Sequence, residues 1–219
     1  MKKERIGLFG GTFNPIHSGH LKAAEIVQKR LFLDEVLFIP SYIPPHKKYR
    51  GIADPHHRLK MVELAVRSFP RFVPSSVEID AQERSYSIIT LGKVKKLYPR
   101  SLIFFILGID AFLEIDTWKE YERVLEQCFF VVISRPGFHL GDAGNVLGGE
   151  IEGKMFLVPE AEALNPDMLD KYRIFLLPIN ALSIASTEIR KRALKGESIK
   201  SMVPGEVEAY IKENKLYQS

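Results

Sequence analysis

The sequence predicts an α/β fold in which the strands of a largely parallel sheet alternate with helices on both faces. Two observations lead to this class. Short apolar runs alternate along the 219 residues with segments whose apolar positions recur at helical spacing. One run, Leu102–Leu107, is apolar at every position, which is typical of a strand buried on both faces of a parallel sheet. Right-handed crossovers through the intervening helices would join such strands.

The expected strands begin with Arg5–Phe9, which two glycines follow, and Val36–Ile39, which Pro40 stops. Val73–Ile79 is a weaker candidate, because its apolar pattern is less regular. The remaining strands are short apolar runs between helical segments: Leu102–Leu107, Phe129–Ile133, Met155–Val158 and Ile174–Leu177.

The expected helices show apolar residues at helical spacing or a start signal. Leu21 and Ala24 begin an apolar stripe that runs to Leu31. Asp54 and Pro55 provide a capping side chain and a proline at the first helical position. The predicted helices are His20–Leu31, a helix from Pro55 through Val66, Ser87–Leu97, Glu120–Gln127, Thr187–Lys195 and Gly205–Asn214. The last two form a small helical C-terminal part.

The composition, 46% hydrophobic and 26% charged, indicates a globular chain, and we expect one domain over residues 1–219. The single cysteine, Cys128, excludes a disulfide framework and a multi-cysteine zinc site and suits a reducing compartment. Because it precedes a buried strand, we expect it in the core rather than as a nucleophile. Gly137–Gly153 holds six glycines and is expected to be a mobile surface loop.

Targeting and charge also limit the function. No uncharged apolar run approaches the ~20 residues that span a bilayer, and the short charged start does not form a signal peptide, so we expect a cytoplasmic protein with no membrane partner. The net charge of +4 arises from basic residues spread along the chain, which favours a small anionic ligand over nucleic acid. The oligomeric state stays open, a homodimer included.

The most informative segment connects the first strand to the first helix and reads Gly-Gly-Thr-Phe-Asn-Pro-Ile-His-Ser-Gly-His-Leu, residues 10–21. Ligands of parallel α/β sheets bind beyond the carboxyl ends of the strands, where this loop lies. The two glycines allow a tight turn and a close approach of the backbone to a ligand. His17 and His20, three residues apart at a helix start, can face one phosphate group.

Three other readings of this loop are disfavoured. It lacks the Gly-x-Gly-x-x-Gly pattern of hydride-transfer enzymes, and it lacks the Gly-x-x-x-x-Gly-Lys-Ser/Thr pattern of P-loop kinases. A metal site at His17 and His20 is also disfavoured, because no cysteine or carboxylate lies at ligand spacing. His56 and His57 are adjacent residues at what looks like an exposed helix start. We therefore predict no protein-held metal.

The loop resembles the His-x-Gly-His signature of the nucleotidyltransferase superfamily, and in its extended form it is similar to bacterial-type nicotinate-nucleotide adenylyltransferases. Further matching segments follow in family order and cover nearly the whole chain. They are Pro44-Pro45-His46-Lys47, Arg58 with Met61, Ser85-Tyr86-Ser87, Thr90-Leu91, Gly108-Ile109-Asp110, Trp118, Ser134-Arg135-Pro136-Gly137 and Ala185 through Arg190. The resemblance implies a Rossmann-like nucleotidyltransferase fold. It also implies the conversion of ATP and nicotinate mononucleotide to deamido-NAD and pyrophosphate, with Mg²⁺ carried by the ATP phosphates.

The resemblance also implies residue roles. The catalytic residues would be His17, His20, Lys47 and Arg190, which neutralise and align phosphates. ATP would be bound by Gly10, Gly11, Thr12, Phe13, Gly108, Asp110, Ser134, Arg135, Thr187 and Arg190, with Asp110 on the ribose hydroxyls and Ser134 and Arg135 beside the adenine. The mononucleotide would be bound by Tyr86, Ser87, Trp118 and Lys119, with Trp118 stacked on the pyridine ring.

Some of these roles have a structural alternative, and the chain departs from the family pattern at four positions. Lys47 could be a solvated loop lysine, Trp118 a half-buried packing aromatic, and Thr187 with Arg190 a plain helix start. The departures are Asn14 in place of an aspartate, Ser87 in place of a threonine, Lys119 in place of an aromatic residue, and Ala185 in place of a serine.

Ser87 and Lys119 bear on acid-versus-amide preference, so nicotinamide mononucleotide stays an alternative substrate. Phosphopantetheine adenylyltransferase is an alternative within the superfamily, against which Pro-Pro-His-Lys and Trp118 argue. A non-catalytic nucleotide sensor is an alternative of another class.

Overall fold

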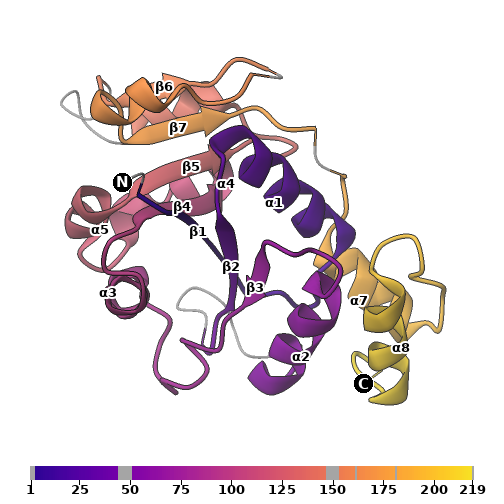
Figure 1. Ribbon diagram of the computed structural model, residues 1–219. Coiled ribbons are helices and arrows are strands. Elements are labelled where there is room, and N and C mark those ends of the chain that lie inside the picture. Colours follow the sequence, from indigo (N-terminus) through magenta and orange to yellow (C-terminus); the bar gives the residue numbers. More distant parts are fainter. Residues whose placement is uncertain (1–2, 44–50, 147–152, 161, 181, 219) are drawn as a thin grey trace. The chain divides into compact units, whose positions relative to one another are not determined.

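The computed structural model describes residues 3–43, 51–146, 153–160, 162–180 and 182–218 (Figure 1). Its strands form a seven-stranded sheet in the order β3-β2-β1-β4-β5-β7-β6. The strands are β1 (Arg5–Gly11), β2 (Glu35–Pro40), β3 (Phe72–Pro74), β4 (Leu102–Gly108), β5 (Phe129–Ile133), β6 (Met155–Leu157) and β7 (Ile174–Leu177). The pairs β1–β4, β4–β5, β5–β7 and β6–β7 are all parallel, which confirms the predicted fold class.

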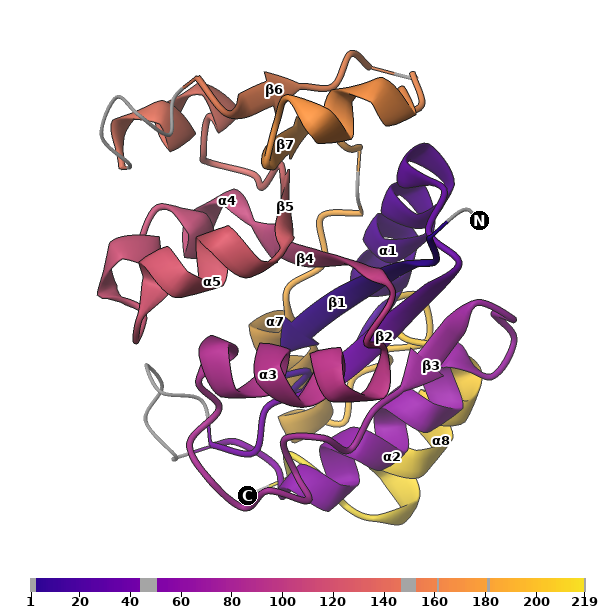
Figure 2. The ribbon, with the colours of Figure 1, turned by 60° about the vertical axis from the view of Figure 1, so that its left-hand side comes forward.

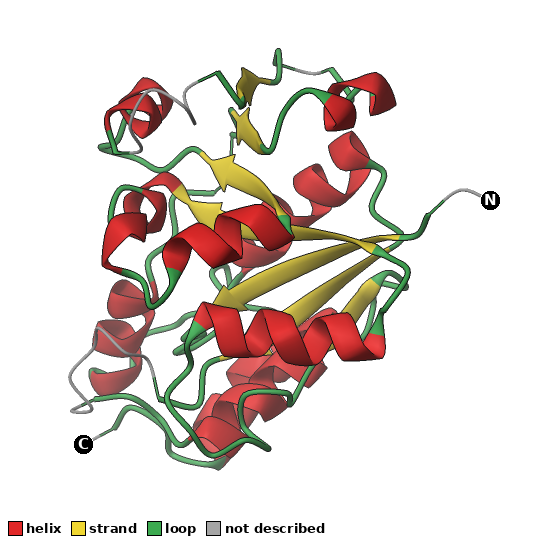
Figure 3. Ribbon diagram, turned by 90° about the vertical axis from the view of Figure 1, so that its left-hand side faces the viewer, coloured by secondary structure: helices red, strands yellow, loops and turns green. Residues whose placement is uncertain are grey.

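Helices alternate with most of these strands along the chain, and Figure 3 shows the helices beside the strands of the sheet. The α-helices are α1 (Ser18–Leu31), α2 (Pro55–Val66), α3 (Ser87–Leu97), α4 (Ile109–Phe112), α5 (Tyr121–Gln127), α7 (Ser186–Leu194) and α8 (Gly205–Glu213). The bounds of α3, β5 and β7 are those predicted from the sequence. The cap at α2 is confirmed, because the Asp54 side chain accepts a hydrogen bond from the His56 amide and Pro55 occupies the first turn.

Two predicted segments differ from the structure. The strand expected over Val73–Ile79 is only Phe72–Pro74, because proline cannot donate to a ladder and the chain then turns. The Asp80 amide bonds the Ser76 carbonyl in that turn. The glycine-rich stretch 137–153, expected as a loop, contains a 3-10 helix over Leu140–Asn145 with Ala143 buried, and residues 147–152 lie outside the described residues. Its mobility stays a prediction.

The chain divides into two compact units that interleave along the sequence. Unit 1 comprises Met1–Gly10, Ala23–Val36 and Tyr86–Asn180, and unit 2 comprises Gly11–Lys22, Leu37–Ser85 and Ala181–Ser219. Each unit has its own buried apolar residues. The expectation of a single domain stays a prediction.

Unit 1 is built on β4, β5, β7 and β6, with α4 packed against β4 and β5 (Figure 2). Aromatic rings fill its centre, where Phe104 stacks on Phe129 and Phe105 on Phe130. Arg30, in the last turn of α1, donates hydrogen bonds to the carbonyls of Glu162 and Pro178 at 2.8 Å each. One arginine thereby fixes the backbone of the segments that flank β7.

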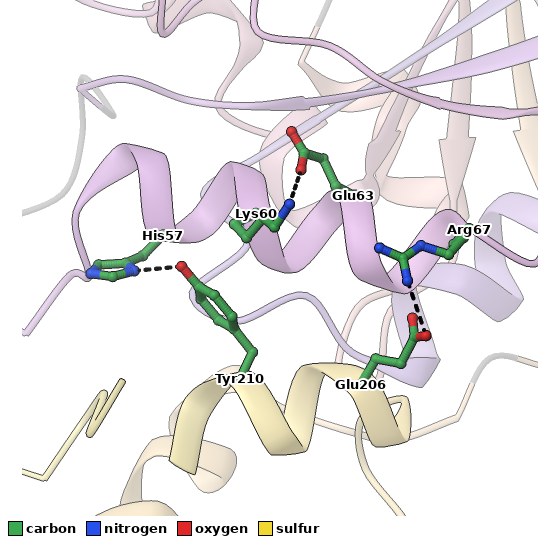
Figure 4. A network of polar contacts seen from close by, with 6 residues as sticks. All are labelled: His57, Lys60, Glu63, Arg67, Glu206 and Tyr210. Atoms are coloured by element: carbon green, nitrogen blue, oxygen red, sulfur yellow. Dashed lines mark hydrogen bonds and ion pairs between the residues drawn. The ribbon is translucent and has the colours of Figure 1, made fainter. Parts of the chain in front are cut away.

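Unit 2 contains α2 and α8, which pack against each other (Figure 4). Near one end of this contact His57 Nδ1 lies 2.8 Å from the Tyr210 hydroxyl, and at the other Arg67 pairs with Glu206 at 3.2 Å. Ile211, the residue after Tyr210 in α8, is 1% exposed. The two adjacent histidines therefore differ, because His56 is exposed whereas His57 takes part in this contact.

Candidate active site

The loop after β1 is shaped by one buried aromatic ring. Phe13 has a positive φ of 45° and is 3% exposed, and its ring meets the His20 ring edge-on at 5.1 Å between centroids. A Cβ added at Gly11 would lie 3.1 Å from the Phe13 ring, so a larger residue would require the ring to shift by a few tenths of an ångström. A Cβ at Gly10 would meet nothing within 4 Å, so no packing within the described residues demands that glycine.

The two histidines of the loop lie against each other. His17 is 3% exposed, His20 is half-buried, and their rings stack with centroids 3.6 Å apart and planes inclined by 23°. The His17 amide donates to His20 Nδ1 at 3.3 Å, and the His20 amide donates to His17 Nδ1 at 3.4 Å. Both Nδ1 atoms therefore act as acceptors toward backbone amides, and the two stacked rings lie at the start of α1.

The glycine between the histidines lies in a tight space. A Cβ at Gly19 would lie 3.0 Å from the Leu182 carbonyl oxygen and 3.1 Å from His17 Nδ1, so a larger residue would require these neighbours to shift by a few tenths of an ångström. Helix α1 begins at Ser18, two residues earlier than predicted, and the Ser18 amide bonds the Met202 carbonyl at 2.9 Å. A side chain at position 19 would therefore disturb the close packing of His17.

Asn14 is the polar centre of the loop. It is 5% exposed, and its Oδ1 accepts from the Ala53 amide at 3.0 Å and from the Tyr217 hydroxyl at 2.9 Å. Its Nδ2 donates to the Gly51 carbonyl at 2.9 Å. Its own carbonyl accepts from Arg190 Nη1 at 2.9 Å. From the sequence, Asn14 is only a departure from the family pattern. Its bonding partners could not be predicted, because they lie 37 to 203 positions away along the chain.

Arg58 is buried beneath the same loop. Only 1% exposed, it donates to the carbonyls of Thr12 at 2.8 Å, Ala53 at 2.9 Å and Tyr42 at 3.2 Å. Burial lowers the pKa of this guanidinium. An arginine with three backbone acceptors has a supporting role. From the sequence, Arg58 is a family match without an assigned role. An arginine in a predicted helix does not reveal from the sequence that its side chain is buried.

Helix α7 brings two predicted phosphate ligands into unit 2. Arg190 is half-buried and reaches the Asn14 carbonyl, and Ser186 Oγ donates to the Pro15 carbonyl at 3.0 Å. Thr187 lies in the first turn, one helical turn before Arg190, and is exposed. The plain-cap alternative therefore does not describe Arg190, which contacts the segment of residues 10–21 after β1, the glycine-rich loop. Lys47 lies outside the described residues.

Unit 1 gathers the residues expected to bind the nucleoside of ATP. Strand β4 ends at Gly108, α4 begins at once, and Asp110 Oδ1 lies 3.7 Å from Arg135 Nε. A Cβ at Gly108 would clash with the Asp110 carboxylate and approach Arg135 Nε to 2.7 Å, so any larger residue there would displace these two side chains. Arg135 Nε is buried and makes no hydrogen bond within the described part of the chain. The Ser134 hydroxyl donates to the Ile179 carbonyl and accepts from the Ile179 amide, at 2.9 Å each.

Unit 1 also brings together part of the predicted mononucleotide site. Lys119 Nζ lies 5.0 Å from the centre of the Tyr86 ring, within cation–π range. Trp118 is half-buried and meets the Phe105 ring edge-on at 5.7 Å. Ser87 is the first residue of α3, next to Tyr86. Two aromatic residues, a hydroxyl and an ammonium group thus come from two short segments of one unit.

The described ranges of the chain hold no group of three or more His, Cys, Asp or Glu side chains arranged to bind a metal ion. Among the helices within those ranges, none is long and apolar enough to cross a membrane. Cys128 is 3% exposed and bonds the Val124 carbonyl, which confirms its predicted place in the core.

Comparison with known proteins now identifies the family. Residues 8–192 match the model of the cytidylyltransferase-like family. The chain belongs to this family. Within it, relatives named probable nicotinate-nucleotide adenylyltransferase are 40% identical in Pelobacter propionicus and 41% identical in Citrifermentans bemidjiense. Each alignment covers 97% of this chain and 98% of the relative. The resemblance predicted from the sequence is thereby confirmed.

Solved structures of this cytidylyltransferase-like type share the fold. The Plasmodium falciparum nicotinic acid mononucleotide adenylyltransferase complexed with NaAD superimposes with a TM-score of 0.72 at 22% identity over 98% of this chain and 97% of that chain. A Vibrio parahaemolyticus structure described as a putative nicotinate-nucleotide adenylyltransferase gives 0.63 at 18% identity, over 99% and 96%. At these identities the likeness supports the fold.

Proposed function

We propose that the chain is a nicotinate-nucleotide adenylyltransferase that joins ATP and nicotinate mononucleotide into nicotinate adenine dinucleotide (deamido-NAD), releasing pyrophosphate, in NAD biosynthesis. The observation that carries this is the near full-length similarity, at about 40% identity, to relatives of that name. The stacked histidine pair at the loop after β1 supports it, because adenylyl transfer needs aligned donors on phosphate. The cytoplasm is the proposed site of action.

The transfer step needs charge neutralisation and alignment more than a covalent nucleophile. An oxygen of the mononucleotide 5′-phosphate forms a bond to the α-phosphorus of ATP, and the bond from that phosphorus to the bridging oxygen breaks as pyrophosphate leaves. His17 and His20 would donate their Nε2–H groups to phosphate oxygens as charge shifts onto the leaving group. Gly11, Thr12 and Phe13 would cradle phosphate with backbone amides.

The cationic groups would hold the leaving pyrophosphate. Arg190 donates one Nη1 hydrogen to the Asn14 carbonyl, and this bond orients the guanidinium. A guanidinium carries five N–H donors in all, so further donors would face the pyrophosphate. Thr187, exposed one turn earlier on α7, would add a hydroxyl for the β- and γ-phosphates. Lys47 is proposed to add a further positive charge.

Asp110 and Arg135 are proposed to bind the nucleoside of ATP. The Asp110 carboxylate, half-exposed at the end of β4, would accept hydrogen bonds from ribose hydroxyls. Gly10 and Gly108 would permit close approach of the ligand to the backbone. The buried Arg135 Nε–H lies beside Asp110 and would donate to the nucleoside. Ser134 would border the adenine through its backbone, because its hydroxyl already bonds Ile179.

The mononucleotide is proposed to bind where Tyr86 and Lys119 meet. Trp118 would stack on the pyridine ring, and Ser87 and the Lys119 ammonium would lie near the carboxylate of nicotinate. A cation favours a carboxylate over a neutral amide, so the acid substrate is expected to be preferred. Mg²⁺ enters as part of the substrate, carried by the ATP phosphates.

The test is pyrophosphate release with ATP and Mg²⁺, run in parallel with nicotinate mononucleotide, nicotinamide mononucleotide and phosphopantetheine, with the product identified by mass. Preferred use of the nicotinate form, giving deamido-NAD, supports the proposal. Comparable use of both pyridine nucleotides retires the acid preference and keeps the enzyme class. Release only with phosphopantetheine moves the chain to another branch of the superfamily. Binding of ATP without release from any acceptor favours a nucleotide sensor.

A further inference from the structure

The C-terminal end of the chain reaches the glycine-rich loop of the same unit. After α8, the Leu216 amide bonds the Ile211 carbonyl at 3.0 Å, and Lys215 has a φ of +50°, which is the usual left-handed helix ending. Tyr217 follows with a φ of +64°, a second left-handed residue, uncommon for a bulky side chain. This backbone places the Tyr217 hydroxyl 2.9 Å from Asn14 Oδ1, across 203 positions of sequence.

The bond from Tyr217 is one of three that hold the Asn14 side-chain amide. Asn14 Oδ1 accepts from Tyr217 and Ala53, while Nδ2 donates to the Gly51 carbonyl. A flipped amide would place its NH₂ group against the Ala53 N–H and its oxygen against the Gly51 carbonyl, so the backbone sets one favourable orientation. In that orientation the Tyr217 hydroxyl supplies the second donor to Oδ1. At 5% exposure, loss of one partner leaves little room for water to replace it.

Two arginines hold the loop backbone around the same point. Arg58 donates to the Thr12 carbonyl and Arg190 to the Asn14 carbonyl, and both guanidinium charges act on the Tyr217 hydroxyl. Burial nevertheless raises the pKa of Tyr217, so its hydroxyl keeps its proton and stays a donor at neutral pH. The loop from Thr12 to Asn14 is thus fixed by three side chains, one of them two residues from the end of the chain.

We propose that Tyr217 is a positioning residue for adenylyl transfer: through Asn14 it sets the conformation of the loop that leads to His17 and the place of the Arg190 guanidinium. The kinetic consequence of this inference rests on the proposed function, whereas its structural consequence concerns only the loop. Tyr217 contacts Asn14 rather than the reacting atoms and acts only through it.

The kinetic experiment compares Tyr217→Phe with Tyr210→Phe. Both variants lose one tyrosine hydroxyl bond within unit 2, but Tyr210 bonds His57 at the α2–α8 contact (Figure 4) rather than the loop. We expect Tyr217→Phe to lower kcat/KM for ATP by roughly five- to twentyfold, because the buried Asn14 Oδ1 loses one of its two hydrogen bonds and the loop is held less firmly. The KM for the mononucleotide should stay within about twofold, and Tyr210→Phe should match wild type. Equal activities for the two variants would overturn the inference.

A double-mutant cycle tests whether Tyr217 acts through the loop and Arg190. If it does, adding Tyr217→Phe to Arg190→Ala should cost much less than Tyr217→Phe costs in wild type. Fully independent, multiplicative losses would show that Tyr217 does not position Arg190 and would contradict the inference.

Hydrogen exchange supplies a readout that does not depend on turnover. The peptide covering residues 12–17 should exchange faster in Tyr217→Phe than in wild type and should be unchanged in Tyr210→Phe. Unchanged exchange in Tyr217→Phe would overturn the inference whatever reaction the wild type catalyses. Failure of the wild type to form deamido-NAD, with the exchange difference present, would reject the proposed function and leave the loop contact standing.

Discussion

At the scale of single residues, polar side chains near the glycine-rich loop divide into groups that support the backbone and groups proposed to bind a ligand. Asn14 and Arg58 are at most 5% exposed and bond backbone groups, with the Tyr217 hydroxyl as a further partner of Asn14. His17 and His20 turn Nδ1 to backbone amides and are proposed to donate to phosphate. Residue type alone could not separate these classes, because the partners that distinguish them are remote in sequence.

Asp110 provides a test of nucleoside binding. Asp110→Ala should weaken MgATP binding by about tenfold or more, because charge-assisted hydrogen bonds to the ribose hydroxyls would be lost. A tenfold loss is about 1.4 kcal/mol, close to the lower end of the roughly 1.5–3 kcal/mol that such bonds contribute. The measurement is the Kd for MgATP by titration calorimetry. Asp116→Ala, which removes an exposed carboxylate six residues further on, is the matched control. Equal affinities for the two variants would remove Asp110 from the site.

Lys119 provides a test of substrate preference. Lys119→Met keeps an apolar stem over the Tyr86 ring and removes the charge. The ratio of kcat/KM for nicotinate over nicotinamide mononucleotide should fall by about five- to tenfold, since the carboxylate loses a cation and the amide does not. Lys96→Met, on the exposed side of α3, should leave the ratio unchanged. An unaltered ratio in Lys119→Met would assign the preference to other groups.

Cys128 should be chemically silent in the native protein. Burial raises the pKa of its thiol to about 12, well above the ordinary thiol value, so almost no thiolate exists at pH 7 to 8. We expect negligible labelling by a thiol reagent over minutes in buffer and complete labelling in denaturant. Stoichiometric native labelling that abolishes activity would reinstate Cys128 as a functional thiol.

At the scale of elements, the sequence predicts the strongly apolar strands and the capped helices well. The bounds of α3, β5 and β7 were predicted without error, since burial on both faces or a clear helical period specifies them. Short elements were not, because Phe72–Pro74 and Leu140–Asn145 depend on turns and local bonds rather than periodicity. The packing of α8 on α2 has no sequence signal, since it joins side chains from distant segments.

The contact between α2 and α8 should depend on apolar burial rather than on its ion pair. Ile211→Ala should lower the free energy of unfolding by about 2–5 kcal/mol, because it opens a cavity at a fully buried site. Glu206→Gln should change it by less than about 1 kcal/mol, because both partners of the Arg67 pair are more than half exposed. Urea denaturation measures both variants. A larger loss for Glu206→Gln would reverse this ranking.

At the scale of the whole molecule, an ordered series of weak motifs indicated the family, and the full-length relatives confirm it. The predicted α/β class with a parallel sheet is also confirmed. The residue roles remain predictions, because motif order specifies which residues are present and not which atoms they contact. Asn14, Arg58 and Tyr217 show the difference, since only the folded backbone brings them to one loop.

The His17→Ala variant tests whether the glycine-rich loop holds residues that catalyse adenylyl transfer. Turnover to deamido-NAD and the Kd for MgATP are measured together, with His57→Ala as the matched control, since that histidine contacts Tyr210 outside the loop. We predict that turnover of His17→Ala falls by about 10²-fold or more while ATP binding weakens much less, because His17 acts chiefly in the transition state. Turnover near that of wild type, with His57→Ala equally active, would contradict the account.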